Sequence, residues 1–203
     1  MAYNPSIGRV LEKGGVNKFV KLMVENTSQL EGINNQDEFD SFHNKLVDLI
    51  KGEVKTNRGK NISYGQAQKP LNVFLKVFVD WSSRPTPKKA NQLRTFLHVP
   101  LDSILMEETK DKFPKEYEEY VVTTYDSIRK DFKKVLIEQN KEVNDRELQR
   151  FIDPSKFSLG GMIFKEMYYA WQQCLRRIYP ERPVLLDVLW SLKRRNSLKE
   201  QEM

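Results

Sequence analysis

The sequence has few of the residues that form disulfides and metal centres. Its 203 residues include one cysteine, Cys174, and two histidines, His43 and His98. One cysteine excludes an intramolecular disulfide and a cysteine-rich zinc site, and two histidines without ligand spacing do not make a metal site. We therefore expect no metal, no cofactor and a reducing, cytoplasmic setting.

Long hydrophobic runs are also missing. No stretch approaches the roughly 18 apolar residues of a membrane span, and the N-terminus has no apolar core of a secretory signal. Glycine and proline number only 9 each, which argues against an all-β fold with many tight turns. We expect a protein that has no membrane partner and few strands.

The sequence does have strong helical periodicity. Apolar residues recur at intervals of three and four, the spacing of a helix with one buried face, whereas period-two alternation is nearly absent. The clearest segments are 16–30, 39–50, 71–79, 115–140 and 164–178. We expect an all-α, compact multi-helix globule in which His43 lies on a helix surface and Cys174 is a buried thiol.

A chain of this length fits a single helical domain over residues 1–203. The alternative is two lobes packed around a cleft near residues 63–106. The charged end, residues 193–203, has the composition of a frayed tail. We expect a monomer. Shorter helices are expected at 91–97, 102–109, 144–151 and 184–192.

The net charge is +6, and an excess of positive charge attracts polyanions without specifying one. Basic residues cluster at 51–60, at 84–94 and at 193–195. The first two clusters flank a pair of motifs in the middle of the chain. If they also flank this pair in space, they form a rim that contacts phosphates; solvated basic loops are the alternative.

The first motif is GQAQKP at residues 65–70. Gly65 permits a positive φ, Ala67 allows close backbone packing, and Pro70 suits the first turn of a helix. We predict a tight hairpin followed by a helix that begins near Lys69. The free N–H groups and the positive dipole end of such a helix form a ready phosphate site.

The second motif is VPLD at residues 99–102. It places Asp102 just after a proline and before a short helix, where an N-cap belongs. A lysine and an aspartate held at two helix N-termini can make a nucleophile and its charge partner. The ordinary alternatives are a solvated lysine for Lys69 and a plain helix cap for Asp102.

Together the motifs resemble the helix-hairpin-helix DNA glycosylase superfamily, in which a Gly-x-Gly/Ala-x-Lys hairpin precedes an apolar helix and a Val-Pro-Val-Asp segment follows. Here Leu101 stands for the second valine, and Ala67 for the second glycine of the commonest hairpin. Lys69 and Asp102 are 33 positions apart, and this spacing is most similar to that of the archaeal 8-oxoguanine DNA glycosylase branch. The resemblance covers residues 63–106, and no iron–sulfur cysteines follow.

The resemblance implies an all-α DNA-repair enzyme that excises a damaged or modified base. Lys69 would attack the sugar carbon of a flipped nucleotide, and Asp102 would stabilise the positive charge that develops. The nucleophile must be neutral, which burial or a positive helix end favours. We expect the flipped base to enter a pocket lined by Trp81, Tyr64 and His98. The alternative for His98 is a structural histidine with satisfied hydrogen bonds.

The same resemblance implies that the hairpin holds DNA through its backbone amides. The expected phosphate-contacting residues are Gly65, Ala67, Arg58, Lys60, Lys88, Lys89 and Arg94. The predicted function is thus a DNA glycosylase with lyase activity at abasic sites, acting through a lysine Schiff base. The alternatives are a helical nucleic-acid-binding protein without chemistry, and a helical interaction or regulatory protein without a nucleic-acid role.

Overall fold

The computed structural model describes residues 10–138 and 164–189. The helix expected at 144–151 and the charged end at 193–203 lie outside these ranges. Within them every regular element is helical, and the only pairing of extended backbone is two isolated bridges, Leu11 with Thr56 and Lys55 with Asn61. The predicted all-α compact globule is confirmed.

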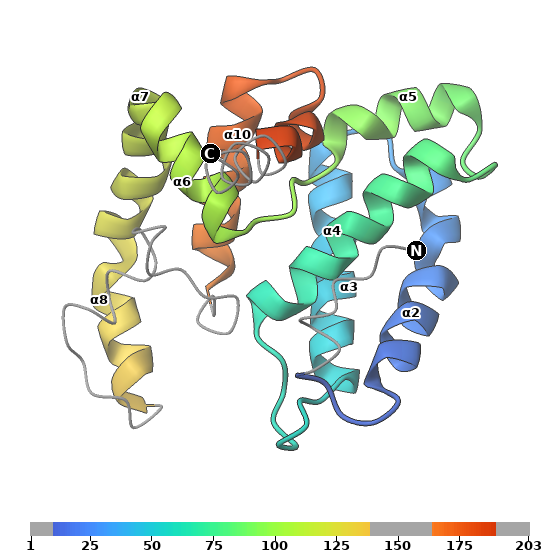
Figure 1. Cartoon of the computed structure of the whole chain (residues 1–203), viewed down its shortest axis with the longest axis horizontal. Coiled ribbons are helices and arrows are strands. Elements are labelled where there is room, and N and C mark those ends of the chain that lie inside the picture. Colours follow the sequence, from blue (N-terminus) through green and yellow to red (C-terminus); the bar gives the residue numbers. More distant parts are fainter. Residues whose placement is uncertain (1–9, 139–163, 190–203) are drawn as a thin grey trace, which may run out of the picture.

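The helices form two groups joined by α10. Figure 1 shows α2 to α5 on one side of the molecule and α6 to α8 on the other, with α10 between them. No helix in the described ranges is long and apolar enough to cross a membrane. The first group consists of α2 (Gly15–Asn26), the 3-10 segment η1 (Thr27–Gly32), α3 (Gln36–Glu53), α4 (Tyr64–Trp81) and α5 (Pro87–Phe96). The second consists of α6 (Ser103–Lys112), α7 (Pro114–Glu116), η2 (Tyr117–Val122) and α8 (Thr123–Glu138). The joining helix α10 (Lys165–Ile178) comes next in the described chain and is followed by the 3-10 segment η5 (Pro183–Asp187).

The core forms where the apolar stripes of these helices meet. α10 buries Trp171, Cys174 and Leu175 completely, and α4 buries Leu71 and Leu75. Each such side chain stabilises the fold by about 1.5–3 kcal/mol relative to an exposed one. The prediction for Cys174 is confirmed: burial, with a smaller contribution from two nearby glutamates, raises the pKa of its thiol to about 12.

The hairpin predicted at residues 65–70 is wrong, because these residues are already helical. Ser63 caps α4, its hydroxyl accepts from the Gln66 amide at 3.1 Å, and the Gln66 side chain accepts from the Ser63 amide at 2.9 Å. This capping box starts the helix at Tyr64 rather than near Lys69. Pro70 therefore lies inside the helix and not in its first turn.

The turn that connects α3 to α4 lies earlier, at residues 55–61. The Thr56 amide donates to the Lys60 carbonyl at 2.7 Å and the Gly59 amide to the Thr56 carbonyl at 2.9 Å. Gly59 has a φ of 71°, which glycine tolerates better than other residues. The basic, glycine-containing composition of residues 51–61 predicts a loop, and this is correct only beyond Glu53, where α3 ends.

The long periodic segment 115–140 is helical but not uniform. Its start forms one wide π turn, η2, between α7 and α8. Tyr117 and Val121 of this turn are buried, and the ring of Tyr117 lies 5.5 Å from that of Trp171 between centroids. The wide turn thus keeps the aromatic face of the segment against α10.

Candidate functional site

Lys69 and Asp102 meet in space, as the two motifs predict. Lys69 Nζ lies 3.1 Å from Asp102 Oδ2, and the two side chains are 15% and 17% exposed. Each therefore retains a small contact with solvent while most of its surface is covered by protein. Partial burial of this kind strengthens the electrostatic interaction between the two charges.

Asp102 is the N-cap of α6, which confirms the cap prediction. Its Oδ1 accepts from the Leu105 amide at 2.9 Å, so one carboxylate oxygen serves the helix and the other serves the lysine. Lys69 comes from the second turn of α4. The prediction of two helix starts is therefore right for the aspartate and wrong for the lysine.

The segment that carries Asp102 is clamped at Val99. The Val99 amide donates to Gln172 Oε1 at 2.9 Å, and Gln172 Nε2 donates back to the Val99 carbonyl at 2.8 Å. Asn72 of α4 donates to the same carbonyl at 3.2 Å. Because Asn72 lies one turn after Lys69, the helix that presents the lysine also holds the segment that presents the aspartate.

A chain of hydrogen bonds buried beneath the pair continues from this clamp. Asn72 donates to the Tyr168 hydroxyl at 2.9 Å. The Tyr168 hydroxyl lies 2.7 Å from His98 Nδ1, and His98 Nε2 lies 2.8 Å from Asp40 Oδ1. The carboxylate can only accept, so His98 donates through Nε2 and its Nδ1 accepts from Tyr168. His98 is thus a structural histidine with both nitrogens satisfied.

The surface position predicted for His43 is wrong. His43 is completely buried, its Nε2 lies 2.8 Å from Asn72 Oδ1, and its ring stacks on Tyr168 with centroids 5.4 Å apart. Its Nδ1 and Gln68 Nε2 are buried without a hydrogen-bond partner in the described residues. We call His43, His98, Asn72 and Tyr168, with Asp40, the buried polar cluster.

Burial keeps this cluster uncharged around its histidines. It lowers the pKa of His43 far below the usual value, with a further contribution from His98, and it lowers the pKa of His98 in spite of the Asp40 carboxylate. Burial alone would raise the pKa of Asp40, but hydrogen bonds from His98 and Gln36 and the charge of Arg176 lower it on balance. Burial also raises the pKa of Tyr168 well above the usual value, so its hydroxyl remains a donor.

The residues expected to line a base pocket do not gather around Lys69. Trp81 is 85% exposed and lies twelve residues further along α4, about 18 Å along the helix axis. Tyr64 is buried and donates to Asn44 Oδ1 at 2.8 Å, and His98 belongs to the buried polar cluster. A pocket formed jointly by these three side chains is therefore not present.

The expected phosphate-contacting residues divide into exposed and internal ones. Arg58, Lys60 and Lys88 are exposed. Lys89 is buried and donates to the Ile33 carbonyl, and Arg94 donates to Asp80 Oδ1 at 2.8 Å. Lys89 and Arg94 thus join elements of the fold, which corrects the prediction of one continuous rim. Gly65 and Ala67 are buried inside α4, so the hairpin amides that were expected to hold a phosphate are absent.

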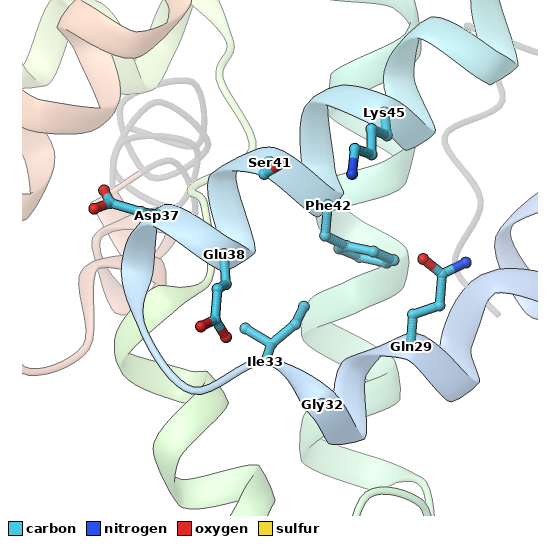
Figure 2. Close-up of a pocket in the computed structure, with 8 residues that line it drawn as sticks. All are labelled: Gln29, Gly32, Ile33, Asp37, Glu38, Ser41, Phe42 and Lys45. Carbon is cyan, nitrogen blue, oxygen red and sulfur yellow. The ribbon is translucent and has the colours of Figure 1, made fainter.

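A separate hollow of about 570 Å³ lies between η1 and α3. Figure 2 shows Phe42 and Ile33 side by side at its base. The carboxylate of Glu38 accepts from the Asn34 amide at 2.7 Å and from Asn35 Nδ2 at 2.8 Å, so it serves the start of α3. The hollow shares no residue with the Lys69–Asp102 pair.

Gln172 and Asn72 were missed by the sequence analysis. Both are polar residues within apolar helical stripes, which is the one signal that could have identified them: Asn72 follows Leu71, and Gln172 follows Trp171. In the described ranges no group of three or more His, Cys, Asp or Glu residues is arranged to hold a metal ion. Comparisons of the chain with models of protein families, with curated proteins and with solved structures found no match.

Proposed function

We propose that the chain is a DNA glycosylase with lyase activity at abasic sites, in which Lys69 forms a Schiff base with the sugar. The observation that carries the proposal is the 3.1 Å contact between Lys69 Nζ and Asp102 Oδ2, two residues 33 positions apart in the chain. This chemistry requires at least a lysine and a carboxylate that are held together in a mostly covered site.

Attack requires the ammonium of Lys69 to give up a proton, and Asp102 Oδ2 is positioned to accept it. The nitrogen then bonds to C1′ of the sugar while the glycosidic C–N bond breaks. The bonding pair leaves with the base, which takes up the proton that Asp102 accepted from Lys69, so that Asp102 is again a carboxylate. Opening of the sugar ring gives the imine, and removal of a proton from C2′ lets the C3′–O bond break with loss of the 3′ phosphate.

The carboxylate has a second role as the base departs. Positive charge develops on the sugar, and Asp102 lies next to the reacting nitrogen with one oxygen fixed by the Leu105 amide. A fixed negative group at this point stabilises the transition state without having to reorganise. The target nucleotide must leave the helical stack to reach the lysine.

Contacts to the DNA backbone are assigned to the turn at residues 55–61. Arg58 and Lys60 are exposed there, directly before α4. Positive side chains on a short turn neutralise phosphates and make binding depend on salt. This turn takes the place of the amide hairpin that the family resemblance implied.

Borohydride trapping tests the proposal. The protein is mixed with duplex and single-stranded DNA that contain an abasic site or 8-oxoguanine. Borohydride then reduces any imine to a stable amine, and a denaturing gel detects the covalent adduct. Lys69→Gln and Asp102→Asn are compared with Lys76→Gln. Lys76 is a matched control because it also lies on α4 and also pairs with an aspartate, Asp187, at 2.9 Å.

The expected result is an adduct that Lys69→Gln abolishes, Asp102→Asn strongly reduces and Lys76→Gln leaves unchanged. An adduct that persists in Lys69→Gln would overturn the assignment of the nucleophile. Absence of any adduct together with a shift of DNA in a native gel would replace the enzyme by the non-catalytic binding protein. Absence of both would leave an ion pair with a structural role, whose aspartate caps α6.

A further inference from the structure

The corner between α4 and α5, residues 81–88, carries an aromatic side chain that the fold does not use. Trp81 is 85% exposed, the highest exposure among the large hydrophobic residues of the described ranges. Large aromatic side chains normally contribute their area to a core or an interface. Val77, one turn earlier on α4, is also partly exposed and extends the apolar surface.

The segment that follows Trp81 carries charges of a single sign. No acidic residue occurs from Trp81 to Leu101, and Arg84 and Lys88 are both exposed. The nearest acid, Asp80, accepts from Arg94 and from Arg182, each at 2.8 Å. Two arginines therefore offset the charge of this carboxylate, and the charged residues exposed within residues 81–88, Arg84 and Lys88, are both positive.

The corner is held rigidly. The two arginines on Asp80 join α4 to α5 and to the segment at η5. The Arg84 amide donates to the Ser82 hydroxyl at 3.0 Å, and Thr86 caps α5. Three residues span at most about 11 Å, so Arg84 lies within reach of a ligand that contacts Trp81. Because these contacts hold the chain on both sides of Trp81, little backbone entropy is lost when a ligand binds.

We infer that this corner, which we call the Trp81 corner, binds single-stranded DNA, with the indole stacked on an unpaired base and Arg84 and Lys88 against phosphates. Aromatic stacking combined with backbone contacts by cations is the general mode of sequence-tolerant single-strand binding. A base exposes its face for stacking only where the strand is unpaired. The positive charge argues for a polyanion over an apolar protein partner.

The Trp81 corner is separate from the Lys69–Asp102 pair. The two lie about 18 Å apart along α4, and Figure 1 shows the corner at one end of the long axis of the molecule. The inference shares with the proposed function only the class of ligand. It requires no chemistry at Lys69, so the two can fail independently.

The test is fluorescence anisotropy with a labelled oligothymidylate of about 15 nucleotides, measured over a range of salt concentrations. Trp81→Ala is expected to raise the Kd about fivefold or more, and Trp81→Phe to retain most of the affinity because it keeps a stacking ring. All variants are checked for native thermal unfolding, which an exposed residue should leave unchanged.

The charges are tested with the double variant Arg84→Gln, Lys88→Gln. For single strands each phosphate contact contributes about 0.7 to the slope of log K against log salt, so the slope should fall by about 1.4. The matched control is Lys112→Gln, Lys115→Gln, which removes two exposed lysines at the α6–α7 corner, at the other end of the molecule. This control should leave the slope unchanged.

Three results would overturn the inference: a Kd for Trp81→Ala within twofold of the wild type, an equal loss in the control double variant, or an equal dependence on Trp81 with a perfect duplex. Trapping on abasic DNA is run in parallel. Binding that depends on Trp81 without an adduct would support the corner and refute the proposed enzyme. An adduct without a dependence on Trp81 would do the reverse.

Discussion

The Lys69–Asp102 pair and the buried polar cluster share two pieces of chain, yet they differ in access to solvent at every cluster residue except Asp40, whose side chain is 23% exposed. Lys69 and Asn72 share α4, and His98 and Asp102 share the extended segment after α5. The pair retains 15% and 17% exposure, whereas His43 is fully covered. The comparison teaches that the sealed polar groups set the geometry, and the accessible ones are left for a reactant.

The largest expected effect separates chemistry from stability at the pair. Lys69→Gln should reduce the rate of borohydride-trapped adduct by at least about 100-fold, because no other group supplies the imine nitrogen. It should lower the free energy of unfolding by about 1–3 kcal/mol, because the mostly covered Asp102 carboxylate loses one partner and keeps the Leu105 amide. Urea unfolding measured beside trapping checks both. A loss of stability above about 3 kcal/mol would make the pair structural instead.

The next effect reverses this pattern at the cluster. Asn72→Ala removes one hydrogen bond from each of three buried groups, His43, Tyr168 and the Val99 carbonyl, and each lost hydrogen bond costs about 0.5–1.5 kcal/mol. We expect the free energy of unfolding to fall by about 3 kcal/mol. Urea denaturation gives this value directly, and a change below about 1 kcal/mol would contradict the role assigned to Asn72.

A dependence on pH should distinguish the cluster in the intact protein. The pKa values of His43 and His98 are lowered in the folded state, so the unfolded chain binds more protons below the ordinary histidine pKa of about 6.5. Stability is then complete above that pH and falls as the pH drops below it, by up to about 2.7 kcal/mol per pH unit for two histidines.

This slope is measured by urea denaturation between about pH 5 and 7.5. Replacing His43 by Gln should remove about half of it, and Lys69→Gln should leave it intact. An unchanged slope in the His43 variant would show that the proton uptake occurs elsewhere. The lowered pKa of Asp40 adds a separate loss of stability only as the pH falls below about 3.8.

The smallest effect concerns the clamp that connects the two regions. Gln172→Ala removes two hydrogen bonds to Val99 and should cost about 1–3 kcal/mol, with a several-fold slower adduct because Asp102 is held less firmly. Gln173, its exposed neighbour, is the matched control, and its replacement by Ala should change neither stability nor adduct rate. Equal effects of the two substitutions would contradict the role assigned to the hydrogen bonds between Gln172 and Val99.

Much of the fold follows from local patterns in the sequence. The apolar stripes of α3, α4 and α10 and the cap at Asp102 depend on residues within one or two turns of each other, so they can be predicted. The predicted start of α4 is wrong because the capping box of Ser63 and Gln66 begins the helix ahead of Gly65 and Pro70. The side-chain hydrogen bonds of the capping box determine the start of the helix, whereas Gly65 and Pro70 are compatible with a turn but do not require one.

The site was predictable only in part, for a different reason. The motif pair correctly brought Lys69 to Asp102, but the distance between them depends on contacts from α10, about 70 residues later in the chain. Hydrogen bonds between distant segments produce no periodic pattern in the sequence. Their only sign is an isolated polar residue within an apolar stripe. The burial of His43 could not be predicted from its own helix, because its hydrogen-bond partner, Asn72, lies on another helix.

The wide turn at Tyr117–Val122 has a consequence for how the chain can vary. Each residue of a helix turns the following ones by about 100°, so deleting a single position from this turn would rotate all of α8 relative to the aromatic contact between Tyr117 and Trp171. The number of residues in this segment therefore matters more than their identity. Substitution within it is constrained only at the buried positions, whereas a change of length by one would redirect a whole helix.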